Sequence, residues 1–265
     1  MFEPNYAISV VTISYNDLEG LRRTRASVVA QTCFESIDHV IVDAGSGGDV
    51  DGFLEDLPPA VQWISEPDAG RYDGMNKGIK LARGKFVWFM NSGDTFSSPD
   101  AIQKALTYVT EPCDWGYGYA RFRGARGEYL GLFGHLPFRM DRFALGGQAV
   151  PHQAAVFGRD LIAKVGLFSL SHGSAADQLY MLECAAIQAP HSIPEILADF
   201  DASGIGSTRR LWHYYRDMNT ARRRAGVVVL RSSKLDKLAT FVLYLSAMAR
   251  SRVEKIVRGH SGHHP

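Results

Sequence analysis

VQWISEPDAGRYDGMNKGIKLARGKFVWFMNSGDTF, at residues 61–96, is the stretch of sequence that decides the fold. A strand-like run, Val61–Ile64, ends in an acidic turn that contains glycine, and a second apolar run, Phe86–Met90, ends abruptly at Asn91-Ser92-Gly93-Asp94. A carboxylate directly after a buried strand stands at the carboxyl edge of the sheet, which is where open α/β sheets bind ligands. Asp94 is therefore the first candidate for holding a metal ion or a phosphate-bearing substrate.

Further strands and helices are predicted before this stretch and within it. Short apolar runs rich in β-branched residues predict buried strands at Ile8–Ile13 and Val40–Asp43. Helices are predicted at residues 17–31, around 53–54 and at 73–84, the first and last capped by Asp17 and Asp73. Strands that alternate with helices imply an α/β fold with a doubly wound parallel sheet.

Each predicted strand leads into a polar loop. The loops lie at Tyr15-Asn16, Asp43, Glu66–Tyr72 and Asn91–Asp94. Because the carboxyl ends of parallel strands meet at one edge of a sheet, we expect the four loops to converge there. A nucleotide-sized binding site at that edge is the first functional hypothesis.

The second half of the chain has a different pattern. Residues 112–150 carry many glycines between short aromatic stretches, which predicts antiparallel hairpins and loops. A strand followed by a helix is predicted at residues 152–165, and another helix begins at Asp177. Two further helices are predicted at 209–224 and 234–257.

The composition is that of a globular protein. The 265 residues suit one large domain, or one domain with a small appendage, and the net charge of +1 gives no argument for nucleic-acid binding. The N-terminus lacks the pattern of a signal peptide, and no apolar run reaches the roughly 18 residues of a spanning helix. The three cysteines are far apart, so a reducing, cytoplasmic location is the expectation.

The last predicted helix is basic and amphipathic. Apolar residues recur at three- and four-residue steps between many lysines and arginines; they are Leu235, Leu238, Val242, Leu245, Ala249 and Ile256. One interpretation is a helix that lies on an anionic membrane surface, peripheral on the inner membrane face. The other is a helix packed on the domain with a solvated face. A disordered tail is predicted after it.

The familiar nucleotide motifs are missing. SYNDLEG follows the first strand in place of GxGxxG, and neither a P-loop nor a GxSxG elbow occurs. The remaining candidates are carboxylates at strand ends. Asp43 could accept hydrogen bonds from a base or ribose, or could only shape its own turn, and Asp68 is first of all a turn residue. The helix that begins at Asp73 offers free N–H groups to a diphosphate.

Three ordered motifs resemble a known family. VVTISYN, VIVDAGS and EPDAGRYDGMNKGIKLARGKFVWFMNSGD, within residues 8–96, resemble the nucleotide loops and central signature of the family 2 glycosyltransferases with the GT-A fold. The form is that of bacterial cell-surface polysaccharide and glycolipid enzymes. A fainter resemblance continues through residues 152–153, 165–168 and 175–177. It implies a nucleotide-diphospho-sugar transferase fold with a central, mostly parallel sheet flanked by helices.

The resemblance also implies a donor site. The residues that would lie beside the nucleotide sugar are Tyr15, Asp43, Asp68, Arg71, Asn76 and Asn91. Asp94 matches the last acid of the metal-binding DxD signature and would hold a divalent cation, Mg²⁺ or Mn²⁺. Such a cation neutralises the charge that develops on a leaving diphosphate.

An acceptor site follows from the same resemblance. Asp177 matches the catalytic base, which would remove the proton of an acceptor hydroxyl as it attacks the anomeric carbon and inverts it. General-base help of this kind gives roughly 10²–10⁴-fold. His152 and Gln153 would lie near the diphosphate or the acceptor. His172 could assist the base, or could be an exposed histidine without a role.

The sequence departs from the family pattern at two places. Asn91 and Gly93 stand where the metal signature often carries Asp, and Leu179 stands where a second acid is common near the base. The thinned motif leaves two alternatives open. One is a nucleotidyltransferase of the sugar-nucleotide type, although SYNDLEG is no basic, glycine-rich loop. The other is a non-catalytic nucleotide-sugar-binding protein.

The preferred interpretation is an inverting, metal-assisted glycosyltransferase that acts on a cell-envelope glycan or glycolipid acceptor. Residues 1–205 would form the GT-A domain, with a nucleotide-binding half at about 1–96 and an acceptor half at about 97–205. Residues 206–265 would form a helical extension.

Overall fold

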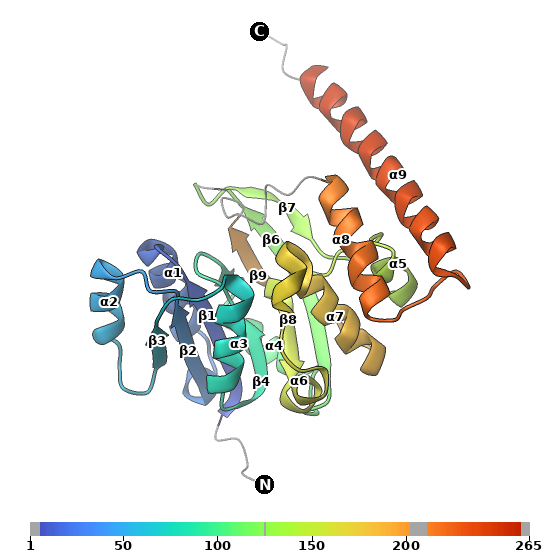
Figure 1. Ribbon diagram of the computed structural model, residues 1–265. Coiled ribbons are helices and arrows are strands. Elements are labelled where there is room, and N and C mark those ends of the chain that lie inside the picture. The colour runs from blue at the N-terminus through green and yellow to red at the C-terminus, as the bar shows by residue number, and fades with distance from the viewer. Residues whose placement is uncertain (1–5, 125, 202–210, 261–265) are drawn as a thin grey trace.

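The computed structural model describes residues 6–124, 126–201 and 211–260, whose elements form one sheet with helices on both faces (Figure 1). The nine described strands pair in the order β3-β2-β1-β4-β8-β6-β9-β5, and β7 pairs with β6. The prediction of an α/β fold with a central, mostly parallel sheet flanked by helices is confirmed.

The N-terminal half of the sheet is parallel. Its strands are β1 (Tyr6–Ser14), β2 (Ile37–Asp43), β3 (Gln62–Ser65) and β4 (Gly84–Phe89). The helices between them are α1 (Leu18–Val29), the 3₁₀ turn η1 (Phe34–Ser36), α2 (Gly48–Glu55) and α3 (Arg71–Leu81). Parallel pairing brings the four carboxyl ends to one edge, as predicted. The side chain of Asp17 caps α1, also as predicted.

Strand β4 supplies side chains to two cores. Phe86 and Trp88 pack on one face with α1 and α4 (Ala101–Leu106), while Val87 and Phe89 pack on the other face with α3 and α7 (Ala176–Ile187). Successive side chains of a strand point to opposite faces of its sheet. A strand covered on both faces must therefore be apolar throughout, which explains the continuous apolar run.

The sheet becomes mixed beyond β4. Strand β8 (Ala155–Gly158) is antiparallel to β4 and to β6 (Trp115–Arg123), and β7 (Tyr129–Phe133) forms a hairpin with β6. Strand β9 (His191–Asp201) lies parallel to β6 and pairs with β5 (Thr95–Phe96). The other elements are α5 (Met140–Ala144), η2 (His152–Ala154), α6 (Arg159–Val165) and η3 (Leu170–Ala175). The hairpin prediction is confirmed; α5 was not predicted.

The boundaries predicted for α3 were wrong at both ends. Gly70, with φ 111°, precedes the first helical residue, so Asp73 lies in the first turn and is not the cap. A φ in this region favours glycine, which is why the helix can begin there. Gly84 does not end the helix but begins β4. A Cβ at Gly84 would overlap the backbone at Ser9, so this strand needs glycine to lie against β1.

Two helices form a C-terminal hairpin. They are α8 (Leu211–Arg224) and α9 (Ser233–His260), close to the predicted ranges, and α9 runs outward beyond the body of the protein (Figure 1). A fully buried ion pair joins them, with Arg222 Nη1 and Asp236 Oδ2 at 2.6 Å. The position of α9 against α8 is therefore fixed by a specific contact.

Part of the apolar side of α9 is exposed. Its large exposed side chains are Leu235, Leu238, Phe241, Val242 and Leu245. Other residues of α9 pack on the domain, since Asp236 pairs with Arg222 and the Tyr244 ring meets Trp212 and Tyr215. Both interpretations of this helix therefore stay predictions. No helix in the described ranges is long and apolar enough to cross a membrane. The boundary predicted at 205–206 and the predicted tail at 261–265 lie outside those ranges.

Candidate functional site

A tight turn after β4 positions Asp94. The Asp94 N–H donates to the Asn91 carbonyl (3.0 Å), and Gly93 takes φ 92°. Thr24 of α1 holds the turn, because its hydroxyl donates to the Asp94 carbonyl (2.7 Å) and accepts from the Gly93 N–H (3.1 Å). The side-chain oxygen of Asn91 is buried and has no hydrogen-bond partner among the described residues. The turn thus holds Asp94 firmly while it leaves polar capacity unused.

Asp94 is a buried carboxyl with little compensation. Only 4% of it is exposed, and its Oδ1 accepts the N–H of Asp201, the last residue of β9 (3.0 Å). Burial raises the pKa of Asp94 to about 8; the Asp201 hydrogen bond opposes this rise, and the Asp201 charge adds to it. The Asp201 carboxylate also pairs with Arg23 (3.2 Å). A cation beside Asp94 would favour its ionised form.

Asp43 connects three of the predicted loops. Its buried carboxylate accepts the Ser46 N–H (2.7 Å), the Ser46 hydroxyl (2.6 Å) and the Ser65 hydroxyl (2.9 Å). The Ser46 hydroxyl in turn accepts the N–H of Asn16 (2.7 Å), beside the 66%-exposed Tyr15. These contacts are those of a turn-forming aspartate. A further role toward a base or ribose stays a prediction for Asp43, as it does for Tyr15.

The loop into α3 carries two more predicted residues. Asp68 Oδ1 accepts the Gly70 N–H (2.8 Å), which is the turn contact expected for it. Arg71, the first residue of α3, is exposed, and its guanidinium lies 5.9 Å from the centre of the Tyr72 ring. Because α3 begins at Arg71, this basic side chain stands at the positive end of the helix dipole, where anions bind favourably.

Asn76 has a packing role that the sequence did not reveal. Its amide group donates to the Phe168 carbonyl (2.9 Å) and accepts the Phe168 N–H (2.8 Å), and only 5% of the residue is exposed. The pair fixes the segment after α6 against α3. This contact accounts for the burial of Asn76, and its predicted place beside the nucleotide stays a prediction.

His152 is buried in an aromatic setting at the same edge. Its ring stacks on Phe89, the last residue of β4, with centroids 5.3 Å apart, and meets Phe168 edge-on. Burial lowers the pKa of His152. The Asp177 carboxylate raises this pKa in part, and the Arg71 charge lowers it again. Its Nε2 has no partner within the described ranges. His152 is therefore a neutral ring with one unused polar atom.

Asp177 lies in the first turn of α7. Its Oδ1 accepts the Gln178 N–H (2.8 Å), and the Tyr72 hydroxyl of α3 hydrogen-bonds to the carboxylate. Burial, and then the Asp177 charge, raise the pKa of Tyr72, so its hydroxyl stays protonated and donates. Tyr72 therefore orients Asp177, a function that the sequence did not predict.

Residues 152–153 lie close to both predicted acids. The Gln153 side chain hydrogen-bonds to Asp94, and His152 lies within range of the Asp177 charge. Asp94 and Asp177 are distant in sequence, yet both lie at the edge where the parallel strands end. Both acids therefore lie near the same two-residue segment, and that they serve one site stays a prediction.

The oxygen atoms around Asp94 are ligands of the kind that a hard divalent cation prefers. No group of three His, Cys, Asp or Glu residues that could hold a metal occurs among the described residues. Asp94 and Asp201 nevertheless place two acids together, and within the described ranges no positive group is recorded beside the buried Asp94. Mg²⁺ and similar ions bind oxygen and commonly use one or two carboxylates together with substrate phosphates. The residues present therefore fit such an ion.

A family comparison decides the identity of this arrangement. Residues 9–157 match the model of glycosyl transferase family 2. The chain belongs to glycosyltransferase family 2. It is 44% identical over 207 residues to the uncharacterized glycosyltransferase Rv1514c of Mycobacterium tuberculosis, covering 76% of this chain and 78% of that protein. This glycosyltransferase is also 27% identical over 190 residues to the PGL/p-HBAD biosynthesis glycosyltransferase Rv2957 of the same species, covering 69% and 71%.

Solved structures show the fold of this glycosyltransferase to be GT-A-like. Residues 1–349 of S. aureus TarS in complex with UDP-GlcNAc superpose with a TM-score of 0.64 at 14% identity, over 90% of this chain and 72% of that one. PcManGT, a mannosyltransferase from Pyrobaculum calidifontis in complex with GDP-Man and Mn²⁺, gives 0.59 at 16% identity, over 98% and 81%. The chain spans 38% of a longer TarS chain.

Three residues of the site were missed from the sequence. Asp201 follows the apolar run of β9 as Asp94 follows that of β4, so the same reasoning could have found it. Tyr72 lay within a recognised motif but gave no sign of its contact with Asp177. Thr24 is one of several polar residues in α1, and nothing in the sequence singles it out.

Proposed function

We propose that this glycosyltransferase moves a sugar from a nucleotide-diphosphate donor to a hydroxyl group of a cell-envelope glycan or glycolipid, with inversion. The observation that carries the proposal is the convergence of Asp94 and Asp177 on residues 152–153. The TarS and PcManGT structures, in complex with UDP-GlcNAc and with GDP-Man, support the donor class. The PGL/p-HBAD relative supports a glycolipid acceptor.

The chemistry assigned to Asp177 is that of a general base. An acceptor hydroxyl is a poor nucleophile until a base takes its proton. Asp177 accepts that proton while the hydroxyl oxygen bonds to the anomeric carbon and the bond to the diphosphate oxygen breaks. Attack opposite the leaving group inverts the anomeric centre. The hydrogen bond from Tyr72 holds the carboxylate in one orientation during this step.

The chemistry assigned to Asp94 is electrostatic. With Asp201 it would hold Mg²⁺ or Mn²⁺, which, when bound, neutralises the charge that develops on the departing diphosphate. The Mn²⁺ in the PcManGT structure supports this cofactor class. Arg71 and the N-terminus of α3 supply further positive potential, while the neutral His152 offers Nε2 to the diphosphate or the acceptor.

The C-terminal hairpin supports a membrane-bound acceptor. Leu235, Leu238 and Val242 of α9 are 50%, 58% and 52% exposed, and Lys234 and Lys237 stand among them. Exposed apolar side chains mixed with lysines suit the surface of an anionic bilayer. The enzyme would then act peripherally at the cytoplasmic face of the membrane. In this division of the chain, residues 1–96 bind the donor, 97–205 carry the base and 206–265 form the extension.

One assay tests the proposal. The protein is incubated with UDP-, GDP- and dTDP-sugars and Mn²⁺, and nucleoside diphosphate release is measured with and without lipid acceptor. We expect release that is lost in Asp94→Ala and Asp177→Asn. Asp160→Asn, an exposed acid in the first turn of α6, is the matched control and keeps full activity. Donor binding without release for every sugar would favour the non-catalytic binding protein instead.

A further inference from the structure

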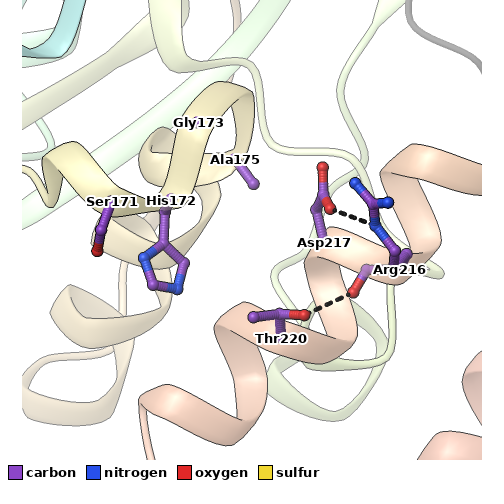
Figure 2. A pocket seen from close by; sticks show the side chains of 7 residues that line it. All are labelled: Ser171, His172, Gly173, Ala175, Arg216, Asp217 and Thr220. Atoms are coloured by element: carbon purple, nitrogen blue, oxygen red, sulfur yellow. Dashed lines mark hydrogen bonds and ion pairs between the residues drawn. The ribbon is translucent and has the colours of Figure 1, made fainter.

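One exposed ion pair joins α1 to the end of β9. Arg23 Nη2 lies 3.2 Å from Asp201 Oδ2, and 178 positions separate the two residues along the chain. Some other exposed pairs are local, such as Arg216 and Asp217 of α8 (3.0 Å), which Figure 2 shows beside a cavity between η3 and α8. A local pair fixes little beyond its own helix, whereas Arg23 reaches a residue of the proposed cation site.

The Arg23 pair lies against the turn that holds Asp94. The Asp201 N–H donates to Asp94 Oδ1 (3.0 Å), and a Cβ placed on Gly93 would lie 3.4 Å from Asp201 Oδ2 and 3.8 Å from Arg23 Nη2. Arg23 thus reaches this turn through Asp201 and not through Asp94. A cation held by the two carboxylates would be close to the guanidinium charge.

Helix α1 fixes the position from which Arg23 reaches the turn. Thr24, the next residue, donates its hydroxyl to the Asp94 carbonyl (2.7 Å) and accepts the Gly93 N–H (3.1 Å). The helix is therefore tied to the turn directly beside Arg23. The packing of α1 directs the guanidinium to this place, so the pair is more than a chance contact on the surface.

The Arg23 pair is partly in solvent, and its partners can be exchanged. The Arg23 side chain is 53% exposed and that of Asp201 25%, whereas the pair of Arg222 and Asp236 is fully buried. Because an exposed ion pair adds little stability, Arg23 can leave Asp201 at little cost when a stronger anion is offered. A diphosphate is such an anion, since a guanidinium binds phosphate oxygens through two parallel hydrogen bonds.

We propose that Arg23 is a positioning residue that makes cation binding depend on the diphosphate. While Arg23 pairs with Asp201, its charge offsets that of one carboxylate and repels a divalent ion. A diphosphate supplies oxygen ligands for the ion and a second partner for Arg23, which then no longer opposes the ion at Asp201. The inference rests on the proposed function and deepens it by naming the residue that couples the donor to the cation.

The first test measures Mn²⁺ binding to the protein without nucleotide, by electron paramagnetic resonance. Arg23→Gln removes the guanidinium charge. Arg22→Gln, which breaks the exposed pair with Glu19 (3.4 Å) on the same helix, is the matched control. We expect about tenfold tighter Mn²⁺ binding in Arg23→Gln, because a positive charge beside a divalent ion is lost, and unchanged binding in the control.

A conservative variant separates the charge from the shape of the side chain. Arg23→Lys keeps the positive charge and should bind Mn²⁺ as the wild type does. A damaged fold would weaken metal binding, so tighter binding in Arg23→Gln alone cannot come from a structural role of Arg23.

The second test follows the donor. UDP, GDP and dTDP are each titrated by calorimetry with and without Mn²⁺. The factor by which Mn²⁺ tightens nucleotide binding equals the factor by which the nucleotide tightens Mn²⁺ binding. We expect this factor to be about fivefold smaller in Arg23→Gln than in the wild type, and unchanged in Arg22→Gln.

Three results would overturn the inference. They are Mn²⁺ binding in Arg23→Gln that is no tighter than in the wild type, a coupling factor that Arg23→Gln leaves unchanged, and a protein that binds no Mn²⁺ with or without a nucleoside diphosphate. Failure of the proposed function is distinguishable, because it would appear as no nucleoside diphosphate release from any nucleotide sugar, whatever the Mn²⁺ titrations show.

Discussion

Two buried aspartates, one at the sheet edge and one in the C-terminal hairpin, are partnered in opposite ways. Asp236 in α9 accepts from Arg222 Nη1 (2.6 Å) and from the N–H groups of Val229 (3.0 Å) and Leu230 (2.6 Å). Asp94 accepts one backbone N–H and faces a second carboxylate, that of Asp201. A buried charge is stable when it is paired and hydrogen-bonded. Asp236 meets that condition within the chain. The Asp94 carboxylate has only the Asp201 N–H and the Gln153 side chain among its described partners, and the proposed cation would supply the charge that pairs with it.

The same contrast extends to the apolar residues. At the sheet edge the apolar side chains are covered on both faces, and several polar atoms, those of Asn91 and His152 among them, lack partners among the residues that the structure describes. In the hairpin the ion pair is buried, and Leu238 and Phe241 are exposed. The described residues of the hairpin also leave Arg222 Nε and Thr240 Oγ1 without partners, so the contrast concerns the two aspartates: an arginine faces Asp236, and a carboxylate faces Asp94. Mutation of each region tests this contrast.

The largest expected effect is the loss of activity in Asp94→Asn. The change keeps the shape and removes the charge that would hold the cation, so we expect kcat/KM to fall by about 10³-fold, the several kcal/mol that Lewis-acid help supplies. Because burial raises the pKa of Asp94 to about 8, the carboxyl without metal is already mainly neutral, as Asn is, and the Tm without metal should not fall. Nucleoside diphosphate release and thermal unfolding measure the two effects. Parallel loss of activity and Tm would mean that Asp94 is structural.

Asp236→Asn should lower stability and leave activity nearly unchanged, the reverse of Asp94→Asn. It leaves the Arg222 guanidinium buried beside a neutral amide, and breaking a buried pair costs about 3–5 kcal/mol. We expect that loss of hairpin stability in denaturant unfolding, with donor hydrolysis within a few-fold of wild type. Asp141→Asn, which breaks the exposed pair with Arg139 (2.7 Å), is the control and should cost at most about 1 kcal/mol. An equal loss of unfolding free energy in the two variants would mean that the buried pair stabilises the protein no more than the exposed pair does.

The exposed face of α9 should matter for binding and not for stability. Replacing Leu238, Val242 and Leu245 together by serine removes side chains that are 58%, 52% and 40% exposed, so much of their apolar surface is already in water. We expect little change in Tm and about 100-fold weaker binding to anionic phosphatidylglycerol vesicles, from roughly 1 kcal/mol per side chain. Sedimentation with vesicles measures this binding. Leu130→Ser with Leu132→Ser, equally exposed on β7, is the control and should bind normally.

His39 adds a third buried titratable group to the comparison of Asp94 and Asp236. Both nitrogens of its neutral ring have hydrogen-bond partners. Arg25 donates to its Nδ1 (3.2 Å), so Nε2 carries the proton, toward the Thr12 hydroxyl (3.0 Å). Burial, then the Arg25 charge, lower the pKa of His39 to about 3. Between pH 6.5 and about 3, His39 is therefore protonated in the unfolded chain but stays neutral in the folded chain.

The free energy of unfolding should consequently decrease as the pH is lowered through that window. The loss is about 1.4 kcal/mol per pH unit, or about 2 kcal/mol from pH 6.5 to 5. Urea unfolding of wild type and His39→Gln across this range measures the difference. The variant should lose less stability on acidification. Identical slopes for the two proteins would show that His39 is protonated in the folded state.

The sequence revealed the parallel half of the fold and its polar edge, because β-branched runs that end in polar turns are local signals. It also pointed to Asp94 and Asp177, which lie in recognisable motifs. It could not show that Asp201 or Thr24 reaches the Asp94 turn, since both contacts depend on how distant elements pack. The beginning of α3 was missed because the sequence offered Asp73 as a cap, and the left-handed backbone of Gly70 caps the helix instead.

The order of β8 and β6 beyond β4 was likewise hidden, because antiparallel and parallel strands of this length have the same apolar pattern. The exposed side of α9 illustrates the same limit. Its amphipathic spacing was plain in the sequence, but only the packing of α8 and α9 shows that several of the apolar residues stay partly exposed.

The most direct test of the central claim, that two distant acids serve one reaction site, is a crystal structure with Mn²⁺ and the nucleoside diphosphate that the enzyme releases. We expect anomalous density for Mn²⁺ bonded to the Asp94 carboxylate and to the diphosphate, with Asp177 facing the space that the transferred sugar would occupy. A nucleotide bound away from the carboxyl edge of β1–β4, or Mn²⁺ that makes no contact with Asp94, would contradict the account.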